Sequence, residues 1–148
     1  MNTQKLFKVM ANKKVFGERN KSLSDQLLGE KLYYDWVITT AFYSSIHFVE
    51  DKIFPTKVSS VDCNCIADVK KAYKVAGRHE ARERLVYDKL GTYVGVRYKW
   101  LDDRSRYSRY ETFKFQPADA LKAQEYLNFI QKECYPPEKE DDSTSIEV

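Results

Sequence analysis

The chain has 148 residues and carries 25 Lys and Arg against 22 Asp and Glu, a formal net charge of +3. This balance excludes both a strongly basic nucleic-acid coat protein and a strongly acidic protein. The length predicts one domain, and 43% hydrophobic residues can fill a single core, which excludes intrinsic disorder for most of the chain.

The cysteines and the apolar stretches of the sequence indicate the cellular location that we expect. Three cysteines cannot all pair within the chain, and the first ten residues lack the apolar core of a signal peptide, so we expect a reduced, cytoplasmic location. The longest uncharged stretch, residues 36–49, is shorter than the roughly 18–20 residues that a bilayer requires. We therefore expect no membrane-spanning segment.

The first half of the chain predicts one strong helix. Residues 3–16 show weak helical periodicity, and residues 17–30 are expected to be a connection. Residues 31–54 predict a central helix, because apolar residues recur every three or four positions and others widen the stripe to most of the circumference. The stripe consists of Tyr34, Ile38, Phe42, Ile46, Val49 and Ile53, widened by Val37, Ala41 and Phe48.

In the second half, Gly and Pro mark the expected helix ends. Residues 55–77 are a connection with room for a short helix through Ile66, Val69, Tyr73 and Ala76. Further helices are expected over 78–90, ended by Gly91, over 92–111, and from Pro117 onward, with 112–116 as an extended link.

No segment alternates as a strand would. The expected fold class is all-α, an antiparallel four- or five-helix bundle over residues 1–135. Residues 136–148 are expected to be a disordered acidic tail, because five acids and one lysine follow the Pro136-Pro137 pair.

A polar row interrupts the apolar central helix. Asp35, Thr39, Tyr43, His47 and Asp51 recur every fourth residue and are expected to lie on one side. The row is either a solvent-facing strip or a polar groove lined by His47 and Tyr43. The histidine matters because an ordinary pKa of about 6.5 lets it exchange protons near neutral pH.

A second candidate is the segment GRHEARERL. His79 and Arg82 are one helical turn apart and face the same way, so they predict a phosphate-binding position. The alternative is an exposed helix start in which Glu80 and Glu83 are the charge partners.

The densest group of candidate residues lies in 98–114, YKWLDDRSRYSRYETFK. Arginine forks match phosphate oxygens and tyrosine rings stack on unpaired bases, so this mixture favours single-stranded nucleic acid over a duplex groove. Arg106 and Arg109 are one turn apart and can converge on one anion. Alternatively, Asp102 and Asp103 neutralise the arginines and the tyrosines pack inward. The remaining candidates here are Arg104, Tyr107 and Tyr110.

Signatures of metal and cofactor sites are weak. Cys63, Cys65, His79 and Cys134 suffice in number for zinc, but their spacing matches no standard zinc pattern, so we expect no metal and no cofactor. The sequence has no glycine-rich phosphate loop, no HExxH motif and no serine in a nucleophile elbow.

Four features occur in an order that carries a resemblance. They are DWVITTAFYSSIHFVE in the central helix, a glycine followed by H-x-x-R at His79 and Arg82, Y-x-x-L-x-x-x-S-R-x-x-R-Y from Tyr98 to Tyr110, and an amphipathic last helix. Over residues 5–133 the chain resembles the HEPN superfamily (higher eukaryotes and prokaryotes nucleotide-binding), in its small stand-alone bacterial or phage-type forms.

The resemblance implies an antiparallel helical bundle that pairs as a homodimer around a polar cleft. Many members are metal-independent endoribonucleases of toxin–antitoxin, phage-defence or RNA-processing systems, with a cognate antitoxin or a nucleotidyltransferase as partner. Their hallmark is an Arg followed one or two turns later by a His on the penultimate helix. Here Arg106 or Arg109 matches that Arg, and the position of the His is vacant.

Two hypotheses remain open. In the first, the chain binds RNA or a nucleotide and cleaves it, with His47 or His79 as general acid or base and the arginines stabilising phosphorane charge. In the second, it is a non-catalytic homodimeric protein-interaction module without a nucleic-acid role. The catalytic candidates are His47, Arg106 and Arg109, and the candidates for binding substrate are Tyr43, His79, Arg82, Arg104, Tyr107 and Tyr110.

Overall fold

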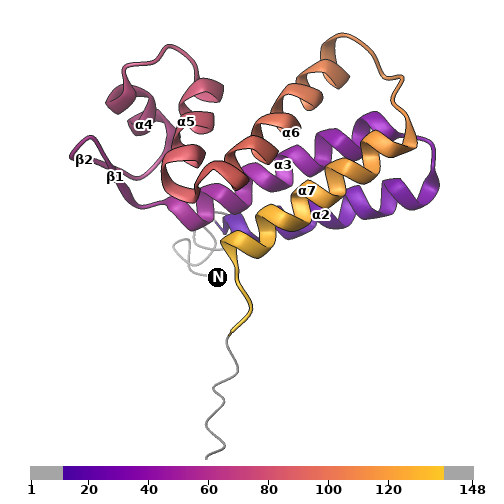
Figure 1. Ribbon diagram of the computed structural model, residues 1–148, viewed down its shortest axis with the longest axis horizontal. Coiled ribbons are helices and arrows are strands. Elements are labelled where there is room, and N and C mark those ends of the chain that lie inside the picture. The colour runs from indigo at the N-terminus through magenta and orange to yellow at the C-terminus, as the bar shows by residue number, and fades with distance from the viewer. Residues whose placement is uncertain (1–11, 139–148) are drawn as a thin grey trace, which may run out of the picture.

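The computed structural model describes residues 12–138, in which helices predominate (Figure 1). The elements of this part are α2 (Lys13–Glu30), α3 (Tyr34–Ile53), β1 (Thr56–Val58), β2 (Val61–Cys63), α4 (Ile66–Tyr73), α5 (Arg78–Leu90), α6 (Thr92–Tyr110) and α7 (Pro117–Cys134). The class is broadly all-α, as expected. Within residues 12–138, no helix has the length and apolar character that crossing a membrane requires.

Helix α3 lies at the centre of this arrangement and packs against α2, α6 and α7 (Figure 1). The helix predicted over 31–54 is confirmed, and so is its wide apolar stripe. Each fully buried large aliphatic or aromatic side chain contributes about 1.5–3 kcal/mol relative to an exposed one, so the buried side chains of this helix contribute substantially to the stability of the core. Its completely buried hydrophobic side chains are Val37, Ile38, Ala41, Phe42, Phe48 and Val49.

The prediction of a connection over residues 17–30 is wrong, because these residues belong to helix α2. The helix begins after Asn12, whose side chain accepts a hydrogen bond from the backbone N–H of Val15. Its buried positions are Gly17 and Ser24, two turns apart, rather than large apolar residues. The Ser24 hydroxyl donates to the Val37 carbonyl oxygen across the contact with α3, at 2.9 Å. Small residues let the two backbones approach closely. Because the contact does not use large apolar residues, the sequence shows no apolar stripe that would predict this helix.

The ends of the other long helices agree with their Gly and Pro signals. Gly91 ends α5 with φ +86°, a conformation that favours glycine. Pro117 begins α7, and the Asp119 carboxylate accepts from the backbone N–H of Gln116 at 3.1 Å. Residues 112–116, predicted to be a link, form neither helix nor strand.

The expectation of no strand is also wrong, because β1 and β2 form an antiparallel hairpin. Val58 pairs with Val61, and Ser59 and Ser60 make the turn with φ of 48° and 66°. Strands of three residues are too short to show alternation, and Ser-Ser is not the Asn-Gly type of signal that such turns usually carry. Helix α4 confirms the short helix expected nearby, except that Ala76 lies beyond its end.

Two expectations fall on parts of the chain outside the described residues. They are the helical periodicity of residues 3–11 and most of the acidic tail, residues 139–148.

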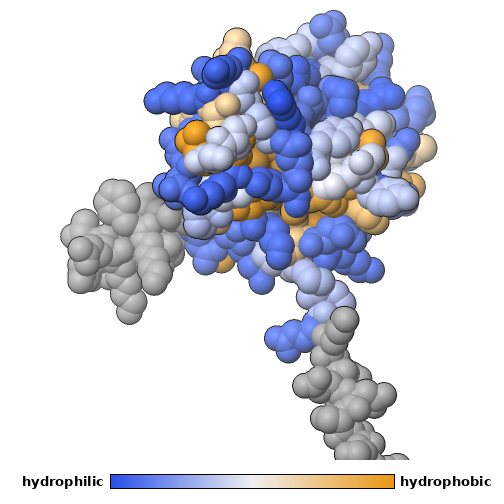
Figure 2. All heavy atoms as spheres, turned by 60° about the vertical axis from the view of Figure 1, so that its left-hand side comes forward, coloured by the Kyte–Doolittle hydropathy of each residue, from blue (hydrophilic) through white to orange (hydrophobic). Residues whose placement is uncertain are grey.

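The surface at the end of the molecule that carries α4, α5 and the hairpin is mainly hydrophilic. In Figure 2, where this end comes forward, the hydrophobic colour shows only in small areas between hydrophilic side chains. The exposed aromatic side chains Trp36, Tyr110 and Phe113 belong instead to the opposite end of α3 and to the end of α6.

The contact between α2 and α3 predicts the effect of adding one methyl group. A Cβ at Gly17 would lie 2.5 Å from the buried ring of Phe48. For Gly17→Ala we expect the free energy of unfolding, measured by urea denaturation, to fall by about 1–2 kcal/mol. Overpacking costs about 1–3 kcal/mol, which exceeds the gain of about 0.5–1 kcal/mol from removing a helical glycine.

Gly29→Ala is the matched control in the same helix. A Cβ there would meet nothing within 4 Å, so only the gain in helix propensity remains. An equal loss of stability in both variants would show that the close approach to Phe48 is not the cause.

Candidate active site

The centre of the candidate site is the carboxylate of Asp102, which is fully buried between α5 and α6. Arg106, one turn later on α6, donates hydrogen bonds to both of its oxygens, with Nε at 3.2 Å from Oδ1 and Nη2 at 3.0 Å from Oδ2. A buried carboxylate is costly unless it is paired in this way. The hydrogen bonds to Asp102 raise the pKa of Arg106, so the guanidinium stays charged.

His79 of α5 lies close to the same carboxylate. Its Nδ1 lies 3.3 Å from Oδ1 of Asp102, although the angle is not that of a hydrogen bond, and this nitrogen is buried. Since 45% of the side chain is nevertheless exposed, the rest of the ring, which carries Nε2, faces outward. The ring also stacks on Phe42 of α3, at 6.4 Å between centroids. A carboxylate at Nδ1 and an open Nε2 are the arrangement in which an acidic group orients a histidine for proton transfer.

A second ion pair lies next to this one and joins three helices. Arg82 Nε of α5 donates to Oε1 of Glu50 on α3 at 3.0 Å, and both side chains are largely buried. Lys13 of α2 reaches the other oxygen of Glu50 at 3.2 Å. Glu50 therefore positions Arg82 one turn away from His79.

The hydroxyl of Tyr98 is buried close to both ion pairs. Burial raises its pKa, the charges of Asp102 and Glu50 raise it further, and Arg82 opposes them. Within residues 12–138 this hydroxyl has no hydrogen-bond partner of good geometry. A buried hydroxyl without such a partner is uncommon and costs free energy. We call Glu50, His79, Arg82, Tyr98, Asp102 and Arg106 the Asp102 cluster.

The side chains of the polar row of α3 do not lie on one side of the helix and have different neighbours. Thr39 is buried, with its hydroxyl 2.7 Å from that of Ser108 on α6. His47 instead stacks on Phe16 of α2, and exposed Asp51 accepts a hydrogen bond from the hydroxyl of Tyr135 at 2.6 Å. Each step of four residues turns a helix about 40° past a full turn, so four steps carry the row almost half way round. Neither a single solvent-facing strip nor a single groove describes it.

His47 has a perturbed titration. Burial lowers its pKa, Lys13 and Arg82 lower it further, and the nearby charge of Glu50 opposes them. These three charges form the ion pairs of Glu50 with Lys13 and Arg82, of which Glu50 and Arg82 belong to the Asp102 cluster. The structure thus places His47 near Arg82 on the α2 side, whereas His79 is the histidine in direct contact with Asp102.

Arg109 extends the site along α6. Its Nη1 donates to the hydroxyl of Ser105, and its guanidinium lies 5.6 Å from the ring centres of both Tyr43 and Tyr110. Among the described residues it has no acidic partner. Asp102, Ser105, Arg106 and Arg109 follow at helical spacing on one side of α6, so this cation continues the face of the Asp102 cluster.

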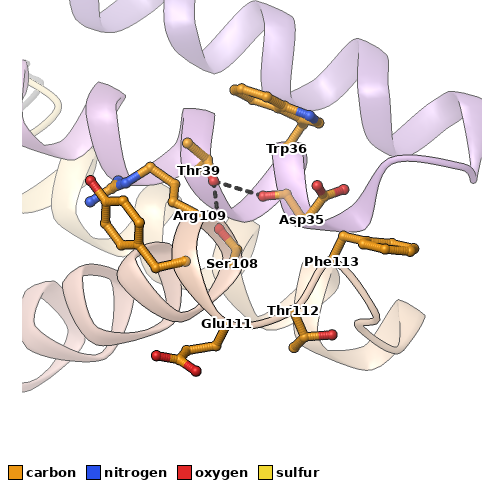
Figure 3. A pocket seen from close by; sticks show the side chains of 9 residues that line it. Asp35, Trp36, Thr39, Ser108, Arg109, Glu111, Thr112 and Phe113 are labelled. Carbon is orange, nitrogen blue, oxygen red and sulfur yellow. Dashed lines mark hydrogen bonds between the residues drawn. The ribbon is translucent and has the colours of Figure 1, made fainter.

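Beyond Arg109, a groove of about 600 Å³ opens between the start of α3 and the end of α6 (Figure 3). Asp35, Trp36 and Thr39 line it from α3, and Ser108, Arg109, Tyr110 and residues 111–113 line it from the other side. Figure 3 shows Thr39 and Ser108 joined across its floor, and Asp35 between the rings of Trp36 and Phe113. We call this space the α3–α6 groove.

Two candidates of the same helix lie apart from the Asp102 cluster. The Arg104 guanidinium lies over the ring of Trp100, and Tyr107 packs edge-on against Phe115. Tyr107 and Tyr110 remain 49% and 77% exposed, so the alternative in which the tyrosines pack inward does not hold for them.

The acidic residues that the sequence suggested as charge partners of the arginines and of His79 do not all have that role in the structure. Asp102 does neutralise an arginine, whereas Asp103 pairs with Lys99 at 3.4 Å. Glu83, expected as a partner for the His79 segment, also pairs with Lys99. The charge partners of His79 and Arg82 therefore come from other helices and not from their own.

No group of three or more His, Cys, Asp or Glu in the described part of the chain is placed to hold a metal ion. Cys63 and Cys134 are buried and Cys65 is exposed, and burial raises the pKa of Cys134 to about 12. Comparisons with family models, with curated proteins and with solved structures find no match to this chain. Its function must therefore be argued from the residues themselves.

Sequence reasoning missed Glu50 and Tyr98 as parts of the site. Glu50 lies one turn beyond His47, and that spacing is a signal that could have included it. The burial of the Tyr98 hydroxyl has no signal in a segment as polar as 98–114.

The lowered pKa of His47 predicts a pH dependence of stability. The unfolded chain binds a proton near the ordinary pKa of about 6.5, whereas the folded chain binds it only at lower pH, so the free energy of unfolding should fall as pH drops below about 6.5. His47→Gln should lose this component. Urea denaturation at about pH 7.5 and about pH 5.5 measures it, and all other titrating groups are common to both proteins. An identical pH dependence in the two proteins would contradict the lowered pKa.

Proposed function

We propose that this chain is a HEPN-type RNA-binding protein that cleaves single-stranded RNA without a metal, with His79 as its proton-transfer residue. The observation that carries the proposal is the contact of buried Asp102 with both His79 and Arg106, which places an outward-facing imidazole beside a guanidinium. The helical class and the order of the helices are consistent with an antiparallel bundle of that superfamily.

The chemistry follows from these groups. Nε2 of His79 takes the proton of a ribose 2′-hydroxyl, the O2′–P bond forms, and the P–O5′ bond breaks as the proton passes to O5′. The products are a 2′,3′-cyclic phosphate and a 5′-hydroxyl. Arg106 and Arg109 stabilise the additional negative charge of the phosphorane, with those N–H groups of Arg106 that Asp102 does not use. Asp102 positions His79 and stabilises the imidazolium.

The assignment of His79 has a direct test in RNA cleavage. We expect purified protein to cut a single-stranded RNA in EDTA and to leave 2′,3′-cyclic phosphate ends. Proton transfer by a positioned side chain contributes about 10²- to 10⁴-fold, so His79→Ala should slow cleavage at least 100-fold. Asp102→Asn should slow it too, because the group that orients His79 loses its charge.

Arg97→Ala is the matched control, since Arg97 lies on the opposite side of α6 over the ring of Phe129. It should cut at the rate of the parent protein. Cleavage that survives in His79→Ala but is lost in His47→Gln would show that the other histidine is the catalytic one.

A second function has one observation in its favour. Trp36, Tyr110 and Phe113 are 54%, 77% and 72% exposed, and exposed aromatic residues in one region are typical of protein interfaces. This favours a non-catalytic homodimeric protein-interaction module without a nucleic-acid role.

The two functions differ in solution behaviour. If the module is correct, light scattering should show a stable dimer, Trp36→Ala should turn it into a monomer, and labelled RNA should migrate unchanged at micromolar protein. RNA binding that weakens as salt is added would contradict it, because that behaviour indicates phosphate contacts.

A further inference from the structure

The α3–α6 groove has aromatic side walls that the proposed cleavage reaction does not use. Trp36 and Phe113 are each more than half exposed, and Figure 3 shows their rings on either side of Asp35. Large aromatic faces left open to solvent beside a cation are the usual platform for an unstacked base. The volume of about 600 Å³ is within the range of small-molecule sites.

Asp35 gives the groove a preference among bases. The carboxylate is half-buried, and in the described part of the chain its oxygens take part in no hydrogen bond or ion pair. An ionised carboxylate only accepts hydrogen bonds and has room for two donors side by side. Guanine offers such a pair, N1–H and N2–H, on its Watson–Crick edge, whereas adenine offers one amino group beside an acceptor nitrogen. The charge and shape therefore favour guanine.

Arg109 supplies the phosphate contact at the other end of the groove. Arg82 and Arg106 are paired with Glu50 and Asp102, whereas Arg109 has no acidic partner among residues 12–138. Arg109 lines the groove, donates to Ser105 and follows Arg106 by one turn of α6. A nucleotide whose base lies in the groove can thus place its phosphate at Arg109, on the side of α6 that carries Asp102 and Arg106.

We propose that the α3–α6 groove binds the guanine base of a nucleotide, with stacking on Trp36 and Phe113, hydrogen bonds to Asp35 and a phosphate contact with Arg109. For RNA, the inference rests on the proposed function: guanosine is then the preferred nucleotide beside the cleaved bond.

Tryptophan fluorescence gives a direct test, because the chain has two tryptophans. Trp100 packs against Tyr126 of α7, away from the groove, so Trp100→Phe leaves Trp36 as the single reporter in the full-length protein. We expect GMP to quench it in a saturable way and to bind about 5- to 100-fold more tightly than AMP, the range for one bidentate base contact.

Variants in the Trp100→Phe protein separate the contacts. Asp35→Asn should abolish the preference for GMP over AMP, and Phe113→Ala should weaken both nucleotides about 5- to 100-fold. Arg109→Ala should remove the advantage of GMP over guanosine. Lys132→Ala, on the far side of α7, should bind as the parent does. Equal affinity for GMP and AMP, or a preference that survives Asp35→Asn, would overturn the proposal.

Two further experiments distinguish RNA from free nucleotide as the ligand, and distinguish failure of the groove proposal from failure of the proposed catalytic function. A short RNA with a single guanosine, added to His79→Ala protein, should quench Trp36 more than the same RNA with adenosine, which extends the site from free nucleotide to RNA. Guanine-dependent quenching without any RNA cleavage would support the groove and reject the catalytic function, whereas cleavage indifferent to Asp35→Asn and to the base would do the reverse. Quenching that depends only on protein concentration would show that a second copy occupies the groove, and would overturn the proposal.

Discussion

The structure depends on the burial of α3. A helix with apolar residues on most of its circumference needs neighbours on several sides, and α2, α6 and α7 provide them. The approach of α2 is close because Gly17 and Ser24 face α3, and the Ser44 hydroxyl donates to the Gly17 carbonyl oxygen at 2.7 Å. Several polar groups of α3 therefore lie at contacts between helices, where Ser108 of α6 is the partner of Thr39 and Arg82 of α5 is the partner of Glu50.

The Asp102 carboxylate imposes a similar constraint on α5 and α6. An uncompensated charge in this position would be strongly unfavourable, so the contact with Arg106 is a condition for burying it. The same carboxylate lies 3.3 Å from Nδ1 of His79, so one buried charge contacts both the guanidinium of Arg106 and the imidazole. In the proposed function, stability and chemistry thus share the contact between Asp102 and Arg106.

How far the sequence predicts this structure depends on the range of each interaction. Periodicity predicted α3, and glycine and proline predicted the end of α5 and the starts of α6 and α7, because those signals are local. Helix α2 was missed because its contact uses small residues, and the hairpin was missed because its strands have three residues each. In the site, the spacing of Asp102 and Arg106 was readable, whereas the pair of Glu50 and Arg82 joins positions 32 residues apart and becomes visible only in the fold.

The three arginines of the site differ in what they offer an anion. Arg82 and Arg106 are already paired with carboxylates, so they contribute directed N–H donors and little net charge. Arg109 lies between tyrosine rings with no acidic partner in the described part of the chain, so no neighbouring carboxylate there compensates its charge. In the proposed function, an approaching phosphate is therefore drawn first to Arg109, and the paired Arg106 and His79 then determine how it is held.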